Sequence, residues 1–414
     1  MSKPWKIGII GGTGRIACAV VCELVQNHTL GRGSILLYGR SPEKLQRNLT
    51  LIGRVGGADA AEIKVGGAAD LDDAIRGADA ILYNATAGLA ESGGYSAFGV
   101  SQGAHILQVA QQVAKLAPEA WLMVDTNPPD VPLMAACRKF GLRRVVGLCN
   151  ASDIFQRVLS AYLGCPERDL TFSEIGVNHE IWFLDILRRG VSVYDELRRT
   201  LPLDYDPSSL KTPYLESFPE WPTAFRNNIA LMAACGYLTA PVGAPGRFRG
   251  LPLTGAELGA LMKRPGDGDY QELVSRNAAR EEILRVIRRC GGGIPVYIAR
   301  VLSAWLSDIP ANESIQVLNE GILSDQPETA LLQVNCRISS RRIVVPKGLR
   351  LPAYISAVLA SRIRQGDLAG RALAEQDESL MRQAMLVCPE RVEIAVAERV
   401  ALGRERVEPH MQLN

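Results

Sequence analysis

A cysteine and a histidine stand out among the residues whose types could do chemistry. Cys149 ends the apolar segment 144–148, and His179, one of only four histidines, follows the strand-like segment 170–176. A thiolate and an imidazole together suit a divalent transition metal, but a separation of 30 residues is too long for a local metal motif. The pair makes a site only if folding brings both side chains together. Otherwise the two are a buried thiol and a structural histidine.

A glycine-rich loop near the start of the chain predicts dinucleotide binding. A strand expected at residues 6–10 runs into GGTGRIA, which contains the GxGxxA form of the dinucleotide fingerprint. The first glycine of the fingerprint allows a tight turn, the second lets backbone approach a pyrophosphate, and the alanine lets the next helix pack closely. Strand, loop, helix and second strand follow in the required order. We therefore expect the cofactor to be bound by Gly11, Gly12, Thr13, Gly14, Arg15 and Ile16.

The end of the second expected strand bears on the choice of cofactor. Folds that bind NAD usually have an acidic residue there, which bonds a ribose hydroxyl. This chain instead has Gly39, Arg40 and Ser41 after the strand. A guanidinium and a hydroxyl together suit the 2′-phosphate of NADP, so the sequence favours NADP slightly over NAD. The alternative is that Arg40 is a solvated surface charge.

These residues need a framework of alternating strands and helices to position them. Apolar strand-like segments alternate with helix-like ones as far as residue 148, which predicts a Rossmann-type, doubly wound α/β fold whose parallel sheet is covered on both faces. Ligands bind such sheets outside the carboxyl ends of the strands. The pattern then changes to a mixed α+β domain. We place a dinucleotide-binding domain at residues 1–165 and a substrate, metal and oligomerisation domain at 166–414.

The composition is that of an ordinary globular protein of 414 residues, enough for two domains. A formal net charge of +2 argues against a nucleic-acid partner held by bulk charge. No run approaches the ~20 apolar residues that span a bilayer, no secretory signal is recognisable, and nine cysteines without a CxxC pair fit a reducing compartment. We expect a cytoplasmic protein without a membrane partner. Apolar helical segments at 294–307 and 352–364 predict a homodimer or homotetramer, unless they form the interior of one chain.

Four segments along the chain point further. They are IGIIGGTG from residue 7, DTNPPD from residue 125, VVGLCNAS from residue 145 and GVNHEIW from residue 176. In this order they resemble family 4 of the glycoside hydrolases, within the lactate/malate-dehydrogenase-like superfamily. Later segments, RCGGG from residue 289, QVLNEGI from residue 316 and the strand pair near 334–343, extend the likeness over nearly the whole chain.

The resemblance implies roles for individual residues. Cys149 and His179 would ligate a divalent metal, usually manganese in the family. Asn84 and Asn127 are assigned to the cofactor. Asn150 and Asn178 are assigned to a sugar or glycoside substrate. The family's catalytic base is a tyrosine on a helix after the histidine segment, which Tyr237 matches best; the alternative is a buried aromatic with a satisfied hydroxyl. Glu91 lies near the position of the family's leaving-group acid.

The reaction implied by the resemblance differs from the usual two-carboxylate glycosidase scheme. Oxidised nicotinamide removes hydride from carbon 3 of the sugar, and the metal polarises the ketone so that the phenolate of the base can take the proton of carbon 2. The glycosidic bond then breaks by elimination, water adds, and the hydride returns. The protein contributes orientation and electrostatics.

Departures from the family pattern leave two other functions open. Glu180 stands where the family has leucine, so a carboxylate lies beside the metal position as a third ligand or as a charge that repels a phosphosugar. No clean leaving-group acid is present between residues 84 and 103, which favours a dehydrogenase or epimerase of a sugar or hydroxy acid as the alternative. A non-catalytic regulator that binds NADP is the second alternative, by analogy of fold alone.

Overall fold

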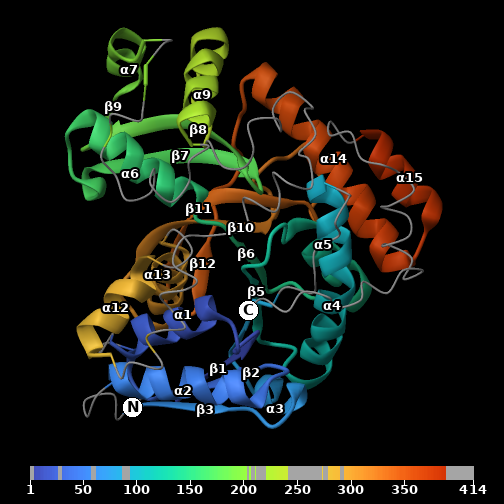
Figure 1. Ribbon diagram of the computed structural model, residues 1–414. Coiled ribbons are helices and arrows are strands. Elements are labelled where there is room, and N and C mark those ends of the chain that lie inside the picture. The colour runs from blue at the N-terminus through green and yellow to red at the C-terminus, as the bar shows by residue number, and fades with distance from the viewer. Residues whose placement is uncertain are drawn as a thin grey trace.

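The structure of the protein is a computed structural model. It describes residues 4–26, 30–56, 62–85, 94–202, 205–206, 210, 221–240, 273, 278–289 and 293–387. Glu91 lies outside the described residues. One twelve-stranded sheet runs through the described part of the chain (Figure 1).

The first half of the sheet consists of six parallel strands. They are β1 (Trp5–Ile10), β2 (Gly33–Tyr38), β3 (Ile63–Gly67), β4 (Ala80–Tyr83), β5 (Trp121–Val124) and β6 (Val145–Leu148). Their order, β3-β2-β1-β4-β5-β6, is that of the dinucleotide-binding fold and confirms the predicted class. The inner strands are apolar and buried, as parallel strands between two helical layers must be.

The second half of the sheet is antiparallel and continues from β6. Its strands are β7 (Leu170–Val177), β8 (Glu180–Arg188), β9 (Val191–Ser192), β10 (Ala311–Leu318), β11 (Leu331–Ser339) and β12 (Arg342–Val344). The order after β6 is β10-β11-β7-β8-β9, and β12 pairs with β11. Strands from both predicted domains therefore share one sheet, and the division at residue 165 stays a prediction.

Helices cover the sheet in three groups (Figure 1). One face of the first half packs on α1 (Arg15–Val25), α2 (Pro42–Gly56), α12 (Arg280–Arg289) and α13 (Ile294–Leu306). The other packs on α3 (Leu71–Ile75), α4 (Gly94–Leu116), α5 (Asp130–Phe140), α14 (Ala353–Glu375) and, through α14, α15 (Glu378–Val387). The hairpin of β7 and β8 lies with α6 (Ala151–Leu163), α7 (Tyr194–Thr200) and α9 (Trp221–Cys235).

Three buried apolar clusters correspond to these groups of helices. The third is aromatic: the rings of Phe155 and Phe183 stack with centroids 4.5 Å apart, and Phe225 packs against Phe155. Because α6 carries Phe155, this cluster fixes the helix that begins just after Cys149. No helix in the described ranges is long and apolar enough to cross a membrane.

Most expected elements are present, with differences at their ends. The strand expected at residues 6–10 and the alternation of strands and helices as far as residue 148 are confirmed. Asp70 caps α3, its Oδ1 accepting from Asp73 N at 2.8 Å. The helix α14 continues to Glu375 rather than ending near 364. The strand β8 was not predicted. It follows β7 through the two-residue turn Asn178-His179, in which His179, at φ 63°, takes the left-handed conformation usual for glycine or asparagine.

Candidate active site

The glycine loop lies at the carboxyl ends of β1, β2 and β4. Gly11 has φ +95°, and a Cβ there would lie 2.4 Å from the carbonyl oxygen of Asn84. The amides of Gly11 and Gly12 both donate to Tyr38 O, at 3.0 and 2.8 Å. Only glycine fits a position with this backbone conformation and this close approach. The loop is thus held between the ends of β2 and β4, with α1 beginning at Arg15 directly behind it.

A buried asparagine that the sequence analysis did not single out secures the loop from below. Asn48 on α2 is fully buried, and its Nδ2 donates to Gly12 O at 2.8 Å and to Gly14 O at 3.2 Å. Its signal in the sequence is a polar residue on the apolar face of an amphipathic helix. The carbonyls of Gly12 and Gly14 are therefore occupied by the protein, as are the amides of Gly11, Gly12 and Gly14. The first turn of α1, directly behind the loop, is the part suited to a pyrophosphate.

Asn84 connects the glycine loop to the next strand end. Its Nδ2 donates to Asp125 Oδ2 at 2.5 Å, and Thr126 Oγ1 donates to Ala85 O at 2.8 Å. Asn127 follows, and its Oδ1 is buried without a hydrogen bond to any described residue. A buried acceptor without a donor is costly unless a ligand satisfies it. This orphaned oxygen at the carboxyl end of β5 fits a hydroxyl or amide donor of a bound cofactor.

Folding brings the backbone of His179 to the side chain of Cys149. The thiol of Cys149, which follows β6, accepts hydrogen bonds from the backbone amides of Ala151 and His179. The pKa of the Cys149 thiol is raised to about 12, mainly by burial. The charge of Asp125 adds to the rise, whereas the two amides and the side chain of Gln333 oppose it. His179 is only partly buried. The two residues that the sequence separates thus meet at one edge of the sheet.

Two glutamines from the C-terminal strands contact the segments that carry Cys149 and Asn178. Gln316 on β10 and Gln333 on β11 are fully buried register partners, and they lie between Gly147 of β6 and Gly176 of β7. Gln333 Nε2 donates to Cys149 O at 3.2 Å, whereas Gln316 Nε2 donates to Asn178 Oδ1 at 2.9 Å. Neither glutamine was predicted. Their signal is a polar residue inside an otherwise apolar strand, which a buried strand tolerates only when the side chain is hydrogen-bonded.

A buried polar network connects to the backbone of Cys149 through Gln333. Ser152 Oγ donates to Glu174 Oε2 at 2.6 Å, Ser314 Oγ donates to Ser152 Oγ at 3.2 Å, and Gln333 Nε2 donates to Ser314 Oγ at 2.9 Å. Burial raises the pKa of Glu174 to about 7, and the serine hydroxyls oppose that rise. The chain of hydrogen bonds links a carboxyl group on β7 to the segment that carries Cys149.

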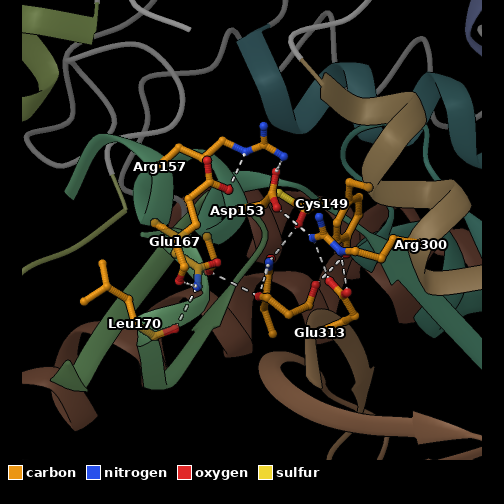
Figure 2. Close-up of polar contacts among 12 residues, drawn as sticks. Cys149, Asp153, Arg157, Glu167, Leu170, Arg300 and Glu313 are labelled. Atoms are coloured by element: carbon orange, nitrogen blue, oxygen red, sulfur yellow. Dashed lines mark hydrogen bonds and ion pairs between the residues drawn. The ribbon is translucent and has the colours of Figure 1, made fainter. Parts of the chain in front are cut away.

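An ion cluster fixes the helix that follows Cys149. Arg300 on α13 pairs with Asp153 at 2.7 Å and with Glu313 of β10, and Arg157 adds a contact of 3.2 Å to Asp153 (Figure 2). The carboxyl side chains of Asp153 and Glu313 are almost fully buried, so each needs this cation. The cluster ties the first turn of α6 to the layer of α13 and thereby sets the position of the Cys149 loop.

The carboxylate beside His179 is occupied by the protein. Glu180 is buried, and its Oε2 accepts from Arg362 Nε of α14 at 2.8 Å. Arg362 Nη1 also donates to Gln365 Oε1 at 3.3 Å. Paired with a guanidinium, the Glu180 charge is largely compensated rather than open towards a ligand.

The predicted base lies further along the hairpin. Thr239 bridges to Trp182 of β8, a register that places Tyr237 opposite Leu184, five residues from His179. At about 3.3 Å per residue this is roughly 16 Å along the strand. The Tyr237 ring packs edge-on against Tyr194, with centroids 6.0 Å apart. A second tyrosine, Tyr354 of α14, packs edge-on against Trp182, nearer the turn that holds His179. Tyr237 therefore stays a prediction as the base.

The donor set at Cys149 suits a metal that takes further ligands from solvent or substrate. Among the described residues no group of three or more histidine, cysteine, aspartate or glutamate side chains converges as a complete cage. A thiolate and an imidazole are nevertheless soft and borderline donors that fit a divalent transition ion. With Cys149 and His179 as its only protein ligands, such an ion would keep coordination positions open, as a catalytic rather than a structural site requires.

Comparison with known proteins places this arrangement in a family. A model of the family 4 glycosyl hydrolases matches residues 91–164, and a model of the C-terminal domain of the same family matches residues 256–390, together about half of the chain. A Bacillus subtilis protein named "Probable 6-phospho-beta-glucosidase" is 25% identical over 244 residues. That alignment covers 56% of this chain and 52% of the relative, so the chain spans about half the length of the relative it matches.

Solved structures share the fold over nearly the whole chain. The 6-phospho-alpha-glucosidase from gut microorganisms in complex with NAD and glucose-6-phosphate superposes with a TM-score of 0.79 at 16% identity, covering 96% of this chain and 97% of that one. The 6-phospho-beta glucosidase from Thermotoga maritima with manganese, NAD+ and glucose-6-phosphate gives a TM-score of 0.71 at 15% identity, covering 96% of each chain. The chain belongs to family 4 of the glycosyl hydrolases.

Proposed function

We propose that this chain is a glycosidase that uses a nicotinamide dinucleotide and a divalent metal, with manganese as the expected ion. It would act on a sugar or glycoside by transient oxidation at carbon 3, deprotonation at carbon 2 and elimination. The observation that carries the proposal is the approach of the His179 backbone amide to the Cys149 thiol, at the same sheet edge as the glycine loop and connected to it through Asn84 and Asp125. Membership of family 4, and relatives whose names state 6-phosphoglycosidase activity, support the same reading.

Each part of the site has a task in such a reaction. Bound nicotinamide would supply a hydride acceptor, and a metal held by Cys149 and His179 would supply a Lewis acid. The glycine loop would let the pyrophosphate approach closely, and the first turn of α1 would bind it. Asn127 Oδ1, buried and without a donor, would accept from the cofactor. Asn150 and Asn178 flank the two ligands in sequence and are proposed to contact sugar hydroxyls.

A tyrosine phenolate would take the proton of carbon 2. Tyr237 stays the predicted base, and Tyr354 is the second candidate because its ring contacts Trp182 on the strand that follows His179. The leaving-group acid predicted at Glu91 lies outside the described residues. The cytoplasmic location and the homodimer or homotetramer likewise stay predictions.

Solvent deuterium exchange tests the proposal. The purified chain, supplied with dinucleotide and Mn²⁺, is screened against aryl glycosides and their 6-phosphates in D₂O. Turnover should place deuterium at carbon 2 of the released sugar without net accumulation of reduced cofactor. The variant Tyr237→Phe should lose exchange and turnover, with Tyr354→Phe as the matched comparison. Cleavage that retains the carbon 2 hydrogen would refute the elimination route, and stoichiometric reduced cofactor would favour a dehydrogenase.

A further inference from the structure

Arg40 follows β2 at the position where folds that bind NAD usually have an acidic residue. Tyr38 of β2, Ile10 of β1 and Tyr83 of β4 lie in one row across the sheet. Gly39 follows Tyr38, and a Cβ there would lie 2.4 Å from Thr13 Cγ2, so the loop rests directly on this strand end. Arg40 comes next and is exposed. The fold thus places the Arg40 backbone where a dinucleotide fold recognises the ribose next to adenine.

No residue in the described part of the chain compensates the charge of Arg40. Arg40 forms no hydrogen bond or ion pair with any described residue, and no acidic residue occurs between the end of β2 and Glu43, which is exposed on the first turn of α2. On the adjacent β3–α3 connection, Asp70 and Asp73 instead accept hydrogen bonds from backbone amides of their own connection and helix. An uncompensated guanidinium at this position attracts an anion and has no favourable partner in a ribose hydroxyl.

The charge of Arg40 acts on two side chains at the ligand-binding end of the sheet. The hydroxyl of Tyr83 lies 2.6 Å from His105 Nδ1, on the other side of the loop from β2. Burial raises the pKa of Tyr83 and lowers the pKa of His105, and the positive charge of Arg40 lowers both. Ser41 Oγ accepts from Lys44 N at 3.3 Å, so its hydroxyl proton remains available to a ligand oxygen.

We propose that this chain selects NADP over NAD, and that Arg40, assisted by the Ser41 hydroxyl, binds the 2′-phosphate. The inference rests on the proposed function, since it requires that a nicotinamide dinucleotide binds at the glycine loop. A guanidinium matches the oxygens of a phosphate in a bidentate manner, whereas a carboxylate at this site would repel them. The solved relatives described above carry NAD, so the choice of cofactor would distinguish this chain from them.

Equilibrium binding of reduced dinucleotides tests the proposal without any turnover. The full chain is titrated with NADPH and with NADH, and binding is followed by nicotinamide fluorescence. The dissociation constant of NADPH should be at least about tenfold lower than that of NADH, on the order expected for a charge-assisted hydrogen bond. Arg40→Ala should weaken NADPH by roughly 10- to 100-fold and change NADH by about two-fold or less. Arg40→Lys, which keeps the charge but loses the fork, should fall between the two. Increasing salt should weaken NADPH more than NADH.

Arg32→Ala is the matched control, because Arg32 is also exposed and lies just before the opposite end of the same strand. It should leave both affinities unchanged. Displacement by 2′,5′-ADP should exceed that by 5′-ADP in the wild type and lose this advantage in Arg40→Ala. Equal or tighter binding of NADH by the wild type, or equal weakening of both dinucleotides by Arg40→Ala, would overturn the inference and leave the proposed function standing. Failure to bind either dinucleotide would contradict both.

Discussion

The two ends of the candidate site are built in opposite ways. The glycine loop is one contiguous segment whose backbone conformation and hydrogen bonds are set by neighbours within the first 84 residues. The Cys149–His179 end is assembled from distant segments. Gln316 contacts Asn178 across 138 positions of sequence, and Gln333 contacts Cys149 across 184. The first end is therefore recognisable from a local sequence motif, whereas the residues of the second end come together only in the folded chain.

This difference has a consequence for tolerance to substitution. At the glycine loop each residue contributes mainly backbone, so binding there depends on conformation. At the Cys149 end, side chains of β10 and β11 contact the segments that carry Cys149 and His179. The buried network of Glu174, Ser152 and Ser314 is hydrogen-bonded to one of these side chains. We expect single substitutions at the two ends to separate dinucleotide binding from metal binding.

The largest expected effect is that of Cys149→Ala. Because the thiolate is one of two predicted protein ligands, its loss should reduce glycosidase activity at least ~1000-fold, or about 4 kcal/mol in the barrier. Bound manganese, measured by elemental analysis of protein purified without chelator, should fall with it. Dinucleotide affinity should remain within about two-fold because the glycine loop is built separately.

Cys137→Ala is the control for this experiment, since Cys137 is a buried free thiol on α5. It should retain manganese and activity. Wild-type activity in Cys149→Ala would show that Cys149 holds no metal that the reaction needs.

The next effect concerns the support of the metal end. Glu174 has an ordinary pKa near 4.5, which burial raises to about 7 in the folded protein. The folded state therefore holds more protons than the unfolded state between these values, and stability falls as pH rises from about 4.5 to about 7. The contribution lost is about 3 kcal/mol. In Glu174→Gln the neutral amide removes this dependence, so the difference in unfolding free energy between the two proteins should change with pH only in this window.

Urea unfolding at a series of pH values measures this difference. Glu328→Gln, which alters an exposed carboxylate, is the control and should follow the wild type. A parallel pH dependence for wild type and Glu174→Gln would show that the pKa of Glu174 is the same in the folded and the unfolded protein, contrary to this expectation.

The sequence predicts the parts of the fold that local patterns determine. Alternating apolar strands and helices defined the six parallel strands, and the spacing of Gly12, Gly14 and Ala17 predicted the loop whose geometry the structure displays. The cap at Asp70 was also readable because a side chain capping its own helix acts over three residues. These features depend on interactions within a short stretch of chain.

Other features depend on contacts that no local pattern encodes. The register that sets Gln316 beside Gln333, and places both between β6 and β7, arises from strands added at the far end of the chain. The pairing of Glu180 with Arg362 joins the start of β8 to a helix 182 positions later. The sequence alone places a carboxylate next to His179 but does not identify its partner. Similarly, Tyr237 was chosen from its place along the chain, and its distance from His179 follows only from the pairing of Thr239 with Trp182.

The smallest expected effect addresses the residue that joins the two ends. Asn84 approaches Gly11 through its carbonyl and holds Asp125 through its amide, and the charge of Asp125 acts on Cys149. Asn84→Ala removes the second contact, so dinucleotide affinity should fall about tenfold, or about 1.4 kcal/mol, and manganese affinity about threefold. Asn312→Ala, an exposed asparagine at the start of β10, is the control. If only dinucleotide affinity changed, the two ends would act independently. Loss of both, with non-additivity in the double variant with Cys149→Ala, would establish that they are coupled through this side chain.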